Sequence, residues 1–399
     1  MLVFFMPATE PPDSANRFAP GESWLDDGGN VINAHGAGLL HHDGIYYWFG
    51  EHKIEGTAGN RAHVGVHVYS SRDLYHWHDE GIALAVSGDP MSPITRGCII
   101  ERPKVLHNAR TGKFVMWFHL EPAGEHGYLN ALRERKPAGV HPKPAGVPGH
   151  PYAQSGVAVA DKPEGPYRFA DSMRPNAGVW PLNVPQEQKQ PLSAAEQAHV
   201  DSLELSGGPR PFHPKHLLFR RDFAGGQMAR DMTLFADDDG TAYHFYSSEG
   251  NGTMHISQLS EDYLRPAGRY MRIFPGRFHE APAVMKWKGR YFLITSDCTA
   301  WAPNAARVSA ADSIWGPWEE LGNPCLGPVE QMPNTYESQG TFILQVAGKP
   351  DAFIFVADRW RPQNAIDGRY VWLPMVFKHG VPMFGWRDRW DLSVFDNAV

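Results

Sequence analysis

The amino-acid sequence predicts an all-β fold, a five-bladed β-propeller, and three observations support this prediction. One phrase recurs along the 399 residues: a polar head residue, an apolar strand, a turn and a second strand rich in aromatics. A further alternating strand follows each of the first four copies, so a unit holds three to four strands. Aromatic residues make up 12% of the chain and Gly and Pro are frequent, as expected for short strands joined by tight turns. This number of strands per repeat favours a propeller.

The repeat has five copies, and each begins with a polar head residue. In the most regular copy, 279–294, Glu280 stands just before a proline and is followed by an apolar strand, a Lys-Gly turn and a second strand. The first strand of every propeller blade lies beside the central axis, so the heads are predicted to meet at one mouth of the channel. In chain order the heads are His35, Glu101, Asp231, Glu280 and Gln339.

Two segments interrupt the repeat, and we expect residues 1–399 to form a single propeller domain that carries both. Closed all-β folds of this length occur as one unit. Residues 133–150, where Lys, Pro, Gly and His dominate, are predicted to form an extended surface loop. The longer insertion, 174–227, contains a predicted short helix over 186–200, where Glu, Gln and Ala are frequent. Loops of this length are usually lids or binding walls.

The charge and hydropathy patterns exclude several classes of partner. The net charge is -7 and no basic run is present, which argues against nucleic acid and anionic membranes as partners. No stretch approaches the roughly 18 apolar residues that a membrane-spanning helix requires. The apolar start Met1–Pro7 lacks the basic region of a signal peptide, so we expect a cytoplasmic protein, with this segment as its plain start or as a strand that latches the ring.

The cysteines, histidines and aspartates give no metal-binding motif. Cys98, Cys298 and Cys325 have no metal-type spacing and are expected to be free and buried. The run 237–240 lacks the spacing of a calcium loop and is interpreted as a hairpin turn. His35 is able to hold an ion or a sugar hydroxyl, or to be a hydrogen-bonded core residue. We predict that no cofactor is required and assign no residue to a metal site, and we leave a structural calcium ion open.

The three carboxylates among the heads suggest a chemistry. Glu101, Asp231 and Glu280 would repel one another at one mouth, so at least one should have a raised pKa. Glycoside hydrolysis needs this arrangement: a protonated acid for the leaving oxygen and a second group that places water or acts as nucleophile. The alternative is that each acid caps a turn or pairs with a nearby arginine, for which Arg102, Arg230 and Arg277 are candidates. Recurrence at the same place in successive blades favours the functional interpretation.

Glu51 and three aromatic residues extend the candidate site. Glu51 ends a strand rich in aromatics, where it either binds a sugar hydroxyl or lies solvated in a loop. Trp301, Tyr370 and Trp372 stand near strand ends and offer apolar faces for stacking a sugar ring, although blades also bury aromatics as core.

Several phrases together make the sequence resemble glycoside hydrolase family 43. They are Asn33–Gly38, Glu101–Val105, Arg230–Phe235, Ser247–Glu249, Glu280–Ala283, Asp358–Trp360 and Arg369–Pro374, and the resemblance covers roughly residues 30–395. Within the family the chain is similar to the branch that contains exo-β-1,3-galactanases. It looks closer still to a neighbouring subfamily with arabinofuranosidase and β-galactofuranosidase activity, because of Gly225–Ala229 and the insertion before it.

The resemblance implies a five-bladed propeller, an inverting and exo-acting mechanism, and roles for all the heads except His35. The general acid matches Glu280, and the Asp that tunes its pKa matches Asp231. In most members of the family an Asp at the head of blade one is the general base. This chain has Asn33-Ala34-His35 at that place and no acid. In the galactanase-like branch a Gln holds the water instead, which matches Gln339.

The identity of the general base is left open at this point. A neutral amide is a poor base, so Gln339 is expected either to orient water or to act through an unusual tautomer. Glu337, two positions earlier, would lie on the same strand face and is a substitute base. Glu101 and Glu249 resemble the substrate-contacting acids of the family.

The predicted function is therefore exo-acting, inverting hydrolysis that removes terminal α-L-arabinofuranosyl or β-D-galactofuranosyl residues from an oligosaccharide or polysaccharide. One alternative is an exo-β-1,3-galactanase. An alternative of another class is a carbohydrate-binding propeller that has lost catalysis, because the usual base is missing. The retained Glu280 and Asp231 count against that alternative, because binding alone does not need a protonated acid beside a carboxylate. The sequence does not indicate an oligomeric state.

Overall fold

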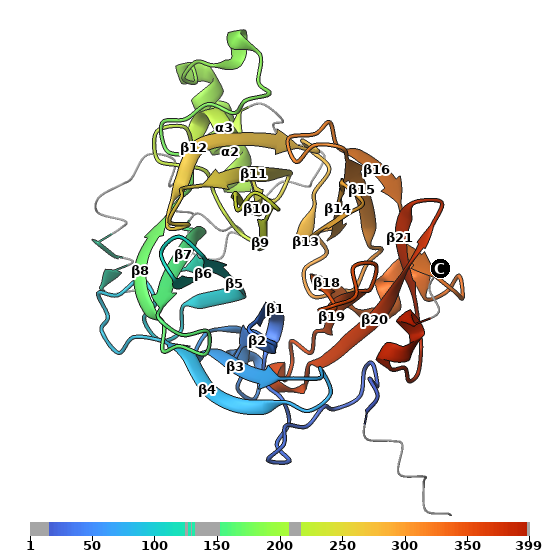
Figure 1. Ribbon diagram of the computed structural model, residues 1–399. Helices are drawn as coiled ribbons and strands as arrows, with labels where there is room; N and C mark the ends of the chain where they lie inside the picture. The colour runs from blue at the N-terminus through green and yellow to red at the C-terminus, as the bar shows by residue number, and fades with distance from the viewer. Residues whose placement is uncertain (1–15, 124–126, 129, 132–151, 207–216, 397–399) are drawn as a thin grey trace, which may run out of the picture.

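The computed structural model confirms the five-bladed β-propeller (Figure 1). It describes residues 16–123, 127–128, 130–131, 152–206 and 217–396. Four sheets of four strands and one sheet of five surround a central axis, and each sheet is one blade. The predicted loop at 133–150 and the segment Met1–Pro7 lie outside the described residues.

The first two blades come from the N-terminal part of the chain. Blade 1 consists of β1 (His35–His42), β2 (Ile45–Glu51), β3 (Gly65–Ser71) and β4 (His78–Ala85). Blade 2 consists of β5 (Ile99–Asn108), β6 (Lys113–Glu121), β7 (Gln154–Ala160) and β8 (Arg168–Met173). Neighbouring strands in both blades are antiparallel.

The remaining blades follow in chain order around the ring. Blade 3 consists of β9 (Met232–Ala236), β10 (Ala242–Ser248), β11 (Thr253–Leu259) and β12 (Pro266–Ile273). Blade 4 consists of β13 (Glu280–Trp287), β14 (Arg290–Ser296), β15 (Arg307–Ala311) and β16 (Glu319–Gly322). Blade 5 consists of β18 (Gln339–Gln345), β19 (Phe353–Arg359), β20 (Arg369–Lys378) and β21 (Val381–Gly385), with β17 (Cys325–Leu326) added in parallel at its outer edge.

The innermost strands β1, β5, β9, β13 and β18 each contact the innermost strand of the next blade, which closes the inner ring. Strand pairing shifts register just after the heads of blades 1, 2, 4 and 5. The residue after the head has a positive φ in three of these blades: Gly36, Arg102 and Ala281. Bulges of this kind bend a strand and re-aim side chains. In these four blades the recurrent head residue therefore marks the position of a β-bulge.

Apolar layers between adjacent blades form the core, and the layer between blades 1 and 5 closes the ring. It contains Trp48, Trp77 and Trp372 together with Phe18, which precedes the first blade. Phe18 exchanges backbone hydrogen bonds with Trp390, and the N–H of Gly21 donates to the carbonyl of Tyr370 at 2.7 Å. Each fully buried side chain of this size contributes about 1.5–3 kcal/mol.

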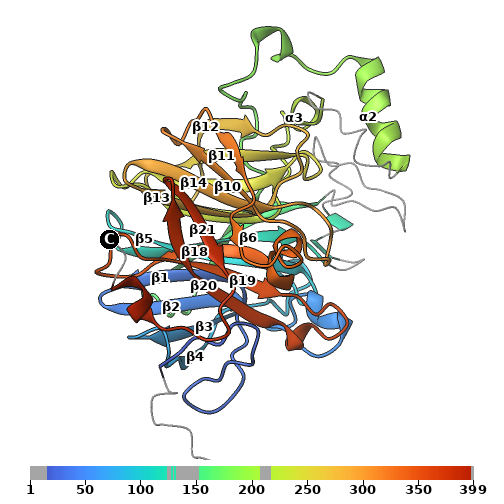
Figure 2. The ribbon, with the colours of Figure 1, turned by 90° about the vertical axis from the view of Figure 1, so that its right-hand side faces the viewer.

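The described part of the 174–227 insertion, residues 174–206 and 217–227, lies on the outer side of blade 3, as Figures 1 and 2 show, and the N–H of Leu182 donates to the carbonyl of Tyr270 in β12 at 2.8 Å. Its helices are α2 (Ala194–Ser206) and α3 (Leu218–Arg221). The predicted helix over 186–200 is thus correct only in its second half. Ser193 and Glu196 form a reciprocal capping box that starts α2, and Pro191 precedes it, so the helix does not extend back to residue 186.

Three cysteines are free and buried, as predicted. Among the described residues, no helix is long and apolar enough to cross a membrane.

Candidate active site

A cavity of about 360 Å³ opens at the mouth of the channel where the heads converge. Four of the five predicted heads line it, together with two other predicted residues, Glu51 and Trp301. The remaining lining residues are Thr57, Asn60, Arg61, Ile99, Arg102, Arg230, Ala300 and Trp360. The cavity therefore combines four carboxyl groups, several cations and two indole rings.

Glu280, the first residue of β13, has the properties of a proton donor. It is 9% exposed, and burial, followed by the charge of Asp231, raises its pKa to about 7, against the opposing effects of Arg230 and Arg102. The amide of Asn251 donates to Glu280 Oε1 at 2.7 Å. The prediction that one of the three carboxyl groups has a raised pKa is confirmed, and this group is protonated for much of the time near neutral pH.

Asp231 is fixed beside Glu280 by two donors. Its Oδ2 accepts from Nε of Arg102 at 2.8 Å and from the backbone N–H of Ala281 at 3.2 Å. The alternative that a head acid pairs with a neighbouring arginine thus also holds for Asp231. The pairing does not remove it from the site, because the carboxylate still lines the cavity and still raises the pKa of Glu280.

Glu101 has the opposite electrostatic environment to Glu280. His119 Nδ1 donates to Glu101 Oε2 at 2.9 Å, and His119 Nε2 donates to Glu121 Oε1 at 3.1 Å. Although burial opposes it, the hydrogen bonds to both carboxylates raise the pKa of His119 to about 9. Burial likewise opposes the effect of His119 on Glu101, whose pKa is nevertheless lowered to about 2. Glu101 is thus a permanent anion suited to accept hydrogen bonds from sugar hydroxyls.

Glu101, His119 and Asp231 also have ligand-type atoms within 4.8 Å of one another. Both ring nitrogens of His119 donate hydrogen bonds, and Asp231 is paired with Arg102. A metal ligand must offer a lone pair, so this donor set does not fit a cation. The prediction of a structural calcium ion gains no support from this cluster.

Glu51, at the end of β2, is 4% exposed and lies on the channel side of blade 1. Its Oε2 lies 2.5 Å from Nζ of Lys53, and its Oε1 accepts from the backbone N–H of Arg102 at 3.0 Å. Burial raises its pKa, Lys53 opposes this shift, and the charge of Glu101 adds to it. Of the two interpretations of Glu51, the structure favours the cavity position over a solvated loop.

Gln339 is held in one orientation by three hydrogen bonds. Its Oε1 accepts from Nη2 of Arg102 at 2.7 Å and from Nε1 of Trp360 at 2.9 Å, and its Nε2 donates to Ser296 Oγ at 2.9 Å. Guanidinium and indole nitrogens only donate, so the assignment of oxygen and nitrogen in this amide follows from its partners.

Trp301 and Trp360 form an apolar wall beside these polar groups. Their rings meet edge to face with centroids 5.7 Å apart, and Trp301 is 38% exposed. Such a wall suits the apolar face of a sugar ring. Trp360 belongs to the family phrase Asp358–Trp360 but was not predicted to be a site residue. The signal that could have found it is its place just after β19, at the channel end of a second strand.

Residues 168–373 match the family model described as glycosyl hydrolases family 43. This chain belongs to glycosyl hydrolase family 43. A family 43 β-1,3-galactosidase solved with galactodeoxynojirimycin is 46% identical, with a TM-score of 0.79, over 94% of this chain and 100% of that one. An exo-β-1,3-galactanase from Phanerochaete chrysosporium, solved with β-1,3-galactotriose, is 28% identical, with a TM-score of 0.70, over 96% of this chain and 70% of that one.

The curated protein that this family 43 chain matches is a β-D-galactofuranosidase of Aspergillus niger. The two are 30% identical over 110 residues, which span 26% of this chain and 32% of that protein. The chain thus aligns with about a third of that relative. As a glycoside hydrolase of family 43, the protein acts on carbohydrate substrates.

Four residues that we predicted as substrate contacts in this family 43 chain do not line the cavity. Glu249 is fully buried in blade 3, where Arg272 Nε lies 2.5 Å from its Oε1 and His255 Nε2 donates to the same oxygen at 2.8 Å. The Arg272 guanidinium also lies 4.1 Å from the ring of Phe219, so this ion pair anchors the 174–227 insertion. The prediction for Glu249 is corrected because its side chain points into the sheet.

His35, Tyr370 and Trp372 are corrected for a related reason. His35 is 1% exposed, with Nδ1 3.4 Å from Asp358 and its ring against Tyr370. The hydroxyl of Tyr370 donates to the carbonyl of Ile32 at 2.8 Å and accepts from the N–H of Ala34 at 2.9 Å. Trp372 is fully buried in the layer between blades 1 and 5. These aromatics are core, which was the alternative interpretation.

Glu337 does not share a strand face with Gln339. It ends a 3₁₀ segment, Met332–Glu337, with a φ of 60°, and β18 starts only at Gln339. Its side chain is 61% exposed, 3.9 Å from Arg359, and lines a hollow of about 330 Å³ that adjoins the cavity and shares Ala300, Trp301, Gln339 and Trp360 with it. The prediction of Glu337 as a substitute base rested on a strand face shared with Gln339, and the structure does not show that shared face.

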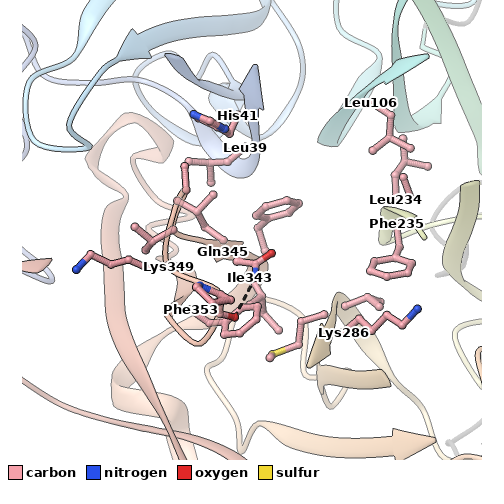
Figure 3. A pocket seen from close by; sticks show the side chains of 18 of the residues that line it. Leu39, His41, Leu106, Leu234, Phe235, Lys286, Ile343, Gln345, Lys349 and Phe353 are labelled. Atoms are coloured by element: carbon pink, nitrogen blue, oxygen red, sulfur yellow. Dashed lines mark hydrogen bonds between the residues drawn. The ribbon is translucent and has the colours of Figure 1, made fainter. Parts of the chain in front are cut away.

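The opposite mouth of the channel combines apolar side chains with polar ones such as His41, Lys286 and Lys349, as Figure 3 shows. A cavity of about 650 Å³ there is lined by residues that follow the heads on the same strands, such as Leu39, Leu106, Leu234 and Val284. Four residues of strand span roughly 13 Å, so the two mouths are well separated. Between them, Lys104 is buried, and its Nζ donates to the carbonyl of Gly36 at 3.1 Å.

Proposed function

We propose that this family 43 enzyme is an exo-acting, inverting β-1,3-galactosidase that removes the terminal galactosyl residue from β-1,3-linked galactans or their oligosaccharides. The observation that carries the hydrolytic part is Glu280, a buried carboxyl group with a pKa of about 7 beside Asp231. The substrate is supported by the 46% identity to a β-1,3-galactosidase over 94% of this chain.

Each group around the cavity has a task in the proposed reaction. Glu280 protonates the glycosidic oxygen as the bond to the anomeric carbon breaks. Glu101, kept anionic by His119, accepts hydrogen bonds from hydroxyls of the terminal sugar. Trp301 and Trp360 stack on the apolar face of that sugar.

The exo mode is supported by the way the cavity is closed on one side. The segment Thr57–Asn60 of blade 1 contacts Ala365–Asp367 of blade 5. The N–H of Gly56 donates to Asn364 Oδ1 at 2.6 Å, and Asn60 Nδ2 donates to the carbonyl of Pro362 at 3.0 Å. These contacts join two loops into a wall, and a walled pocket accepts a chain end more readily than the middle of a chain.

Removal of furanosyl residues is the second candidate. It is favoured by the match to the galactofuranosidase, but this match spans 26% of the chain and is the weaker support. The carbohydrate-binding alternative is disfavoured by Glu280, because binding needs no group that is protonated near neutral pH.

The test is hydrolysis of β-1,3-galactobiose, β-1,3-galactan and the nitrophenyl glycosides of β-D-galactopyranose, β-D-galactofuranose and α-L-arabinofuranose. We expect galactose from the first two, released as the α anomer in early NMR spectra, and little turnover of the furanosides. Glu280→Gln should abolish galactobiose cleavage. Turnover of a furanoside alone would replace the proposed substrate, and no turnover of any substrate would favour a binding protein.

A further inference from the structure

The proposed hydrolysis still lacks an assigned general base, the group that activates the attacking water. An inverting reaction needs a base opposite the acid, to take a proton from the attacking water. Gln339 does not meet this need. Its Oε1 already accepts from Arg102 and Trp360, two groups that never accept, so an imidic tautomer with a proton on this oxygen would face two donors. The remaining N–H of the amide only donates.

The other carboxylates that line the cavity are also poorly placed for this task. Asp231 is bound to Arg102 and to the N–H of Ala281, next to the acid itself, and so lies on the acid's side. Glu101 is bound to the His119 imidazolium, which makes it a weak base, with a pKa of about 2. Among the carboxyl groups that line the cavity, Glu51 remains.

The carboxyl group of Glu51 occupies the place that a side chain at the head of blade 1 would fill. The head residue His35 is turned away toward Asp358, and the next residue, Gly36, has no side chain. A β-carbon on Gly36 would lie 2.2 Å from Glu51 Oε1 and 3.1 Å from its Cδ. Gly36 therefore leaves room for this carboxylate to reach the channel from the end of β2.

Glu51 and Glu280 approach the cavity from different sides. Glu51 belongs to blade 1 and Glu280 to blade 4, and blade 5 separates these two blades in the ring, since its innermost strand contacts both of theirs. Each oxygen of Glu51 accepts one hydrogen bond or ion-pair contact, from Lys53 and from the Arg102 N–H, which leaves a second lone pair on each. The pKa of Glu51, raised by burial, also makes it a better base than an ordinary carboxylate.

We propose that Glu51 is the general base of this enzyme and that Gln339 positions the water. The proposal rests on the proposed hydrolytic function. The water oxygen bonds to the anomeric carbon while the bond from this carbon to the glycosidic oxygen breaks. Glu280 gives its proton to the departing oxygen, and Glu51 takes one proton from the water. The products are a sugar of inverted configuration and an alcohol, and solvent exchange then returns Glu51 and Glu280 to their starting states.

The test measures how each variant depends on the leaving group of the substrate, and whether azide restores the activity of a variant that lacks the base. Wild type, Glu51→Gln, Glu51→Ala, Gln339→Ala and Glu280→Gln are assayed on β-1,3-galactobiose and on 2,4-dinitrophenyl β-D-galactopyranoside. Dinitrophenolate leaves without a proton, so Glu280→Gln should keep most activity on it, whereas Glu51→Gln should lose about 10²–10⁴ in kcat on both substrates. Azide attacks carbon without losing a proton, so it should restore turnover to Glu51→Ala and form the α-galactosyl azide.

The proposal fails if Glu51→Gln keeps kcat within tenfold of wild type, or if azide rescues Gln339→Ala but not Glu51→Ala. Glu51→Gln is isosteric and retains an acceptor for the Arg102 N–H, so it remains a usable variant even where the alanine variant does not fold. A matched control is Glu80→Gln on the outer strand β4 of blade 1, an exposed carboxyl change away from the cavity that should leave kcat unaltered. If wild type cleaves only a furanoside, the substrate proposal fails, while the same variants and azide still test Glu51 on that aryl glycoside.

Discussion

Two glutamates at the ends of second strands, Glu51 in blade 1 and Glu249 in blade 3, have similar sequence settings and opposite positions. Glu51 is the last residue of β2 and pairs with His35, and its carboxyl group reaches the channel. Glu249 stands one residue past the end of β10 with a φ of 54°, and its carboxyl group enters the sheet toward Arg272 and His255. Successive side chains along a strand point to opposite sides. A glutamate one residue further along therefore points into the core of the blade instead of into the channel.

The largest expected difference between the two is in the rate. Glu51→Gln should lower kcat by about 10²–10⁴, as removal of a general base does, whereas Glu249→Gln should leave kcat and KM within a factor of about two. Steady-state kinetics on β-1,3-galactobiose measures both. A loss of kcat in Glu249→Gln without a loss of folded protein would contradict the separation of the two sites.

The stability of the fold should respond in the opposite order. Glu249→Ala leaves Arg272 and His255 buried without their anion, at a cost of about 3–5 kcal/mol in the free energy of unfolding. Glu51→Gln, which keeps an acceptor for Arg102, should cost less. Urea unfolding of the two variants gives the comparison, and equal losses would contradict it.

The contribution of Glu249 to stability should depend on pH in a defined window. Burial opposes the shift, but the charge of Arg272 and the hydrogen bond from His255 lower its pKa from 4.5 to about 2. A lowered folded-state pKa stabilises the native state above the unfolded value, and this stabilisation is lost as pH falls. The difference in unfolding free energy between wild type and Glu249→Gln should therefore shrink between about pH 4.5 and pH 2. A constant difference across this window would refute the assignment.

The alkaline limb of activity should report Glu280. Because the general acid must be protonated, kcat/KM should fall as pH rises through about 7. Asp231→Asn removes a charge that raises this pKa, so the limb should move to lower pH by on the order of one unit, together with a lower maximum rate. A pH profile of both proteins is the measurement. An unmoved limb would mean that another group is the acid.

The smallest predicted effect concerns Lys53, the cation that pairs with Glu51 as Arg272 pairs with Glu249. Lys53 lowers a pKa that burial has raised, so Lys53→Met should raise the pKa of Glu51 further. A base is inactive when protonated, and the acidic limb of kcat/KM should move to higher pH by roughly half a unit. Arg272→Met, beside Glu249, is the matched control and should leave this limb in place.

The sequence located most of the site because the heads belong to a local repeat. Each of the four heads that line the cavity lies within two residues of the start of an innermost strand, so strand position alone predicted that they meet; they are Glu101, Asp231, Glu280 and Gln339. The aromatic predictions were less successful. Trp301 lines the cavity, but Tyr370 and Trp372 are core, because a blade strand presents aromatics to both faces and the composition does not distinguish them.

The sequence by itself determined the five-bladed fold, the polar mouth and the presence of one carboxyl group with a raised pKa. These features follow from the strand period, the recurrent polar head residue and the repulsion of converging acids, all of which can be inferred from the sequence. Only the tertiary structure decided which acid faces the cavity, which is paired with an arginine and which is buried in a blade. Those outcomes depend on partners far away in sequence, such as Arg102 for Gln339 and Arg272 for Glu249, and on the room that Gly36 leaves for Glu51.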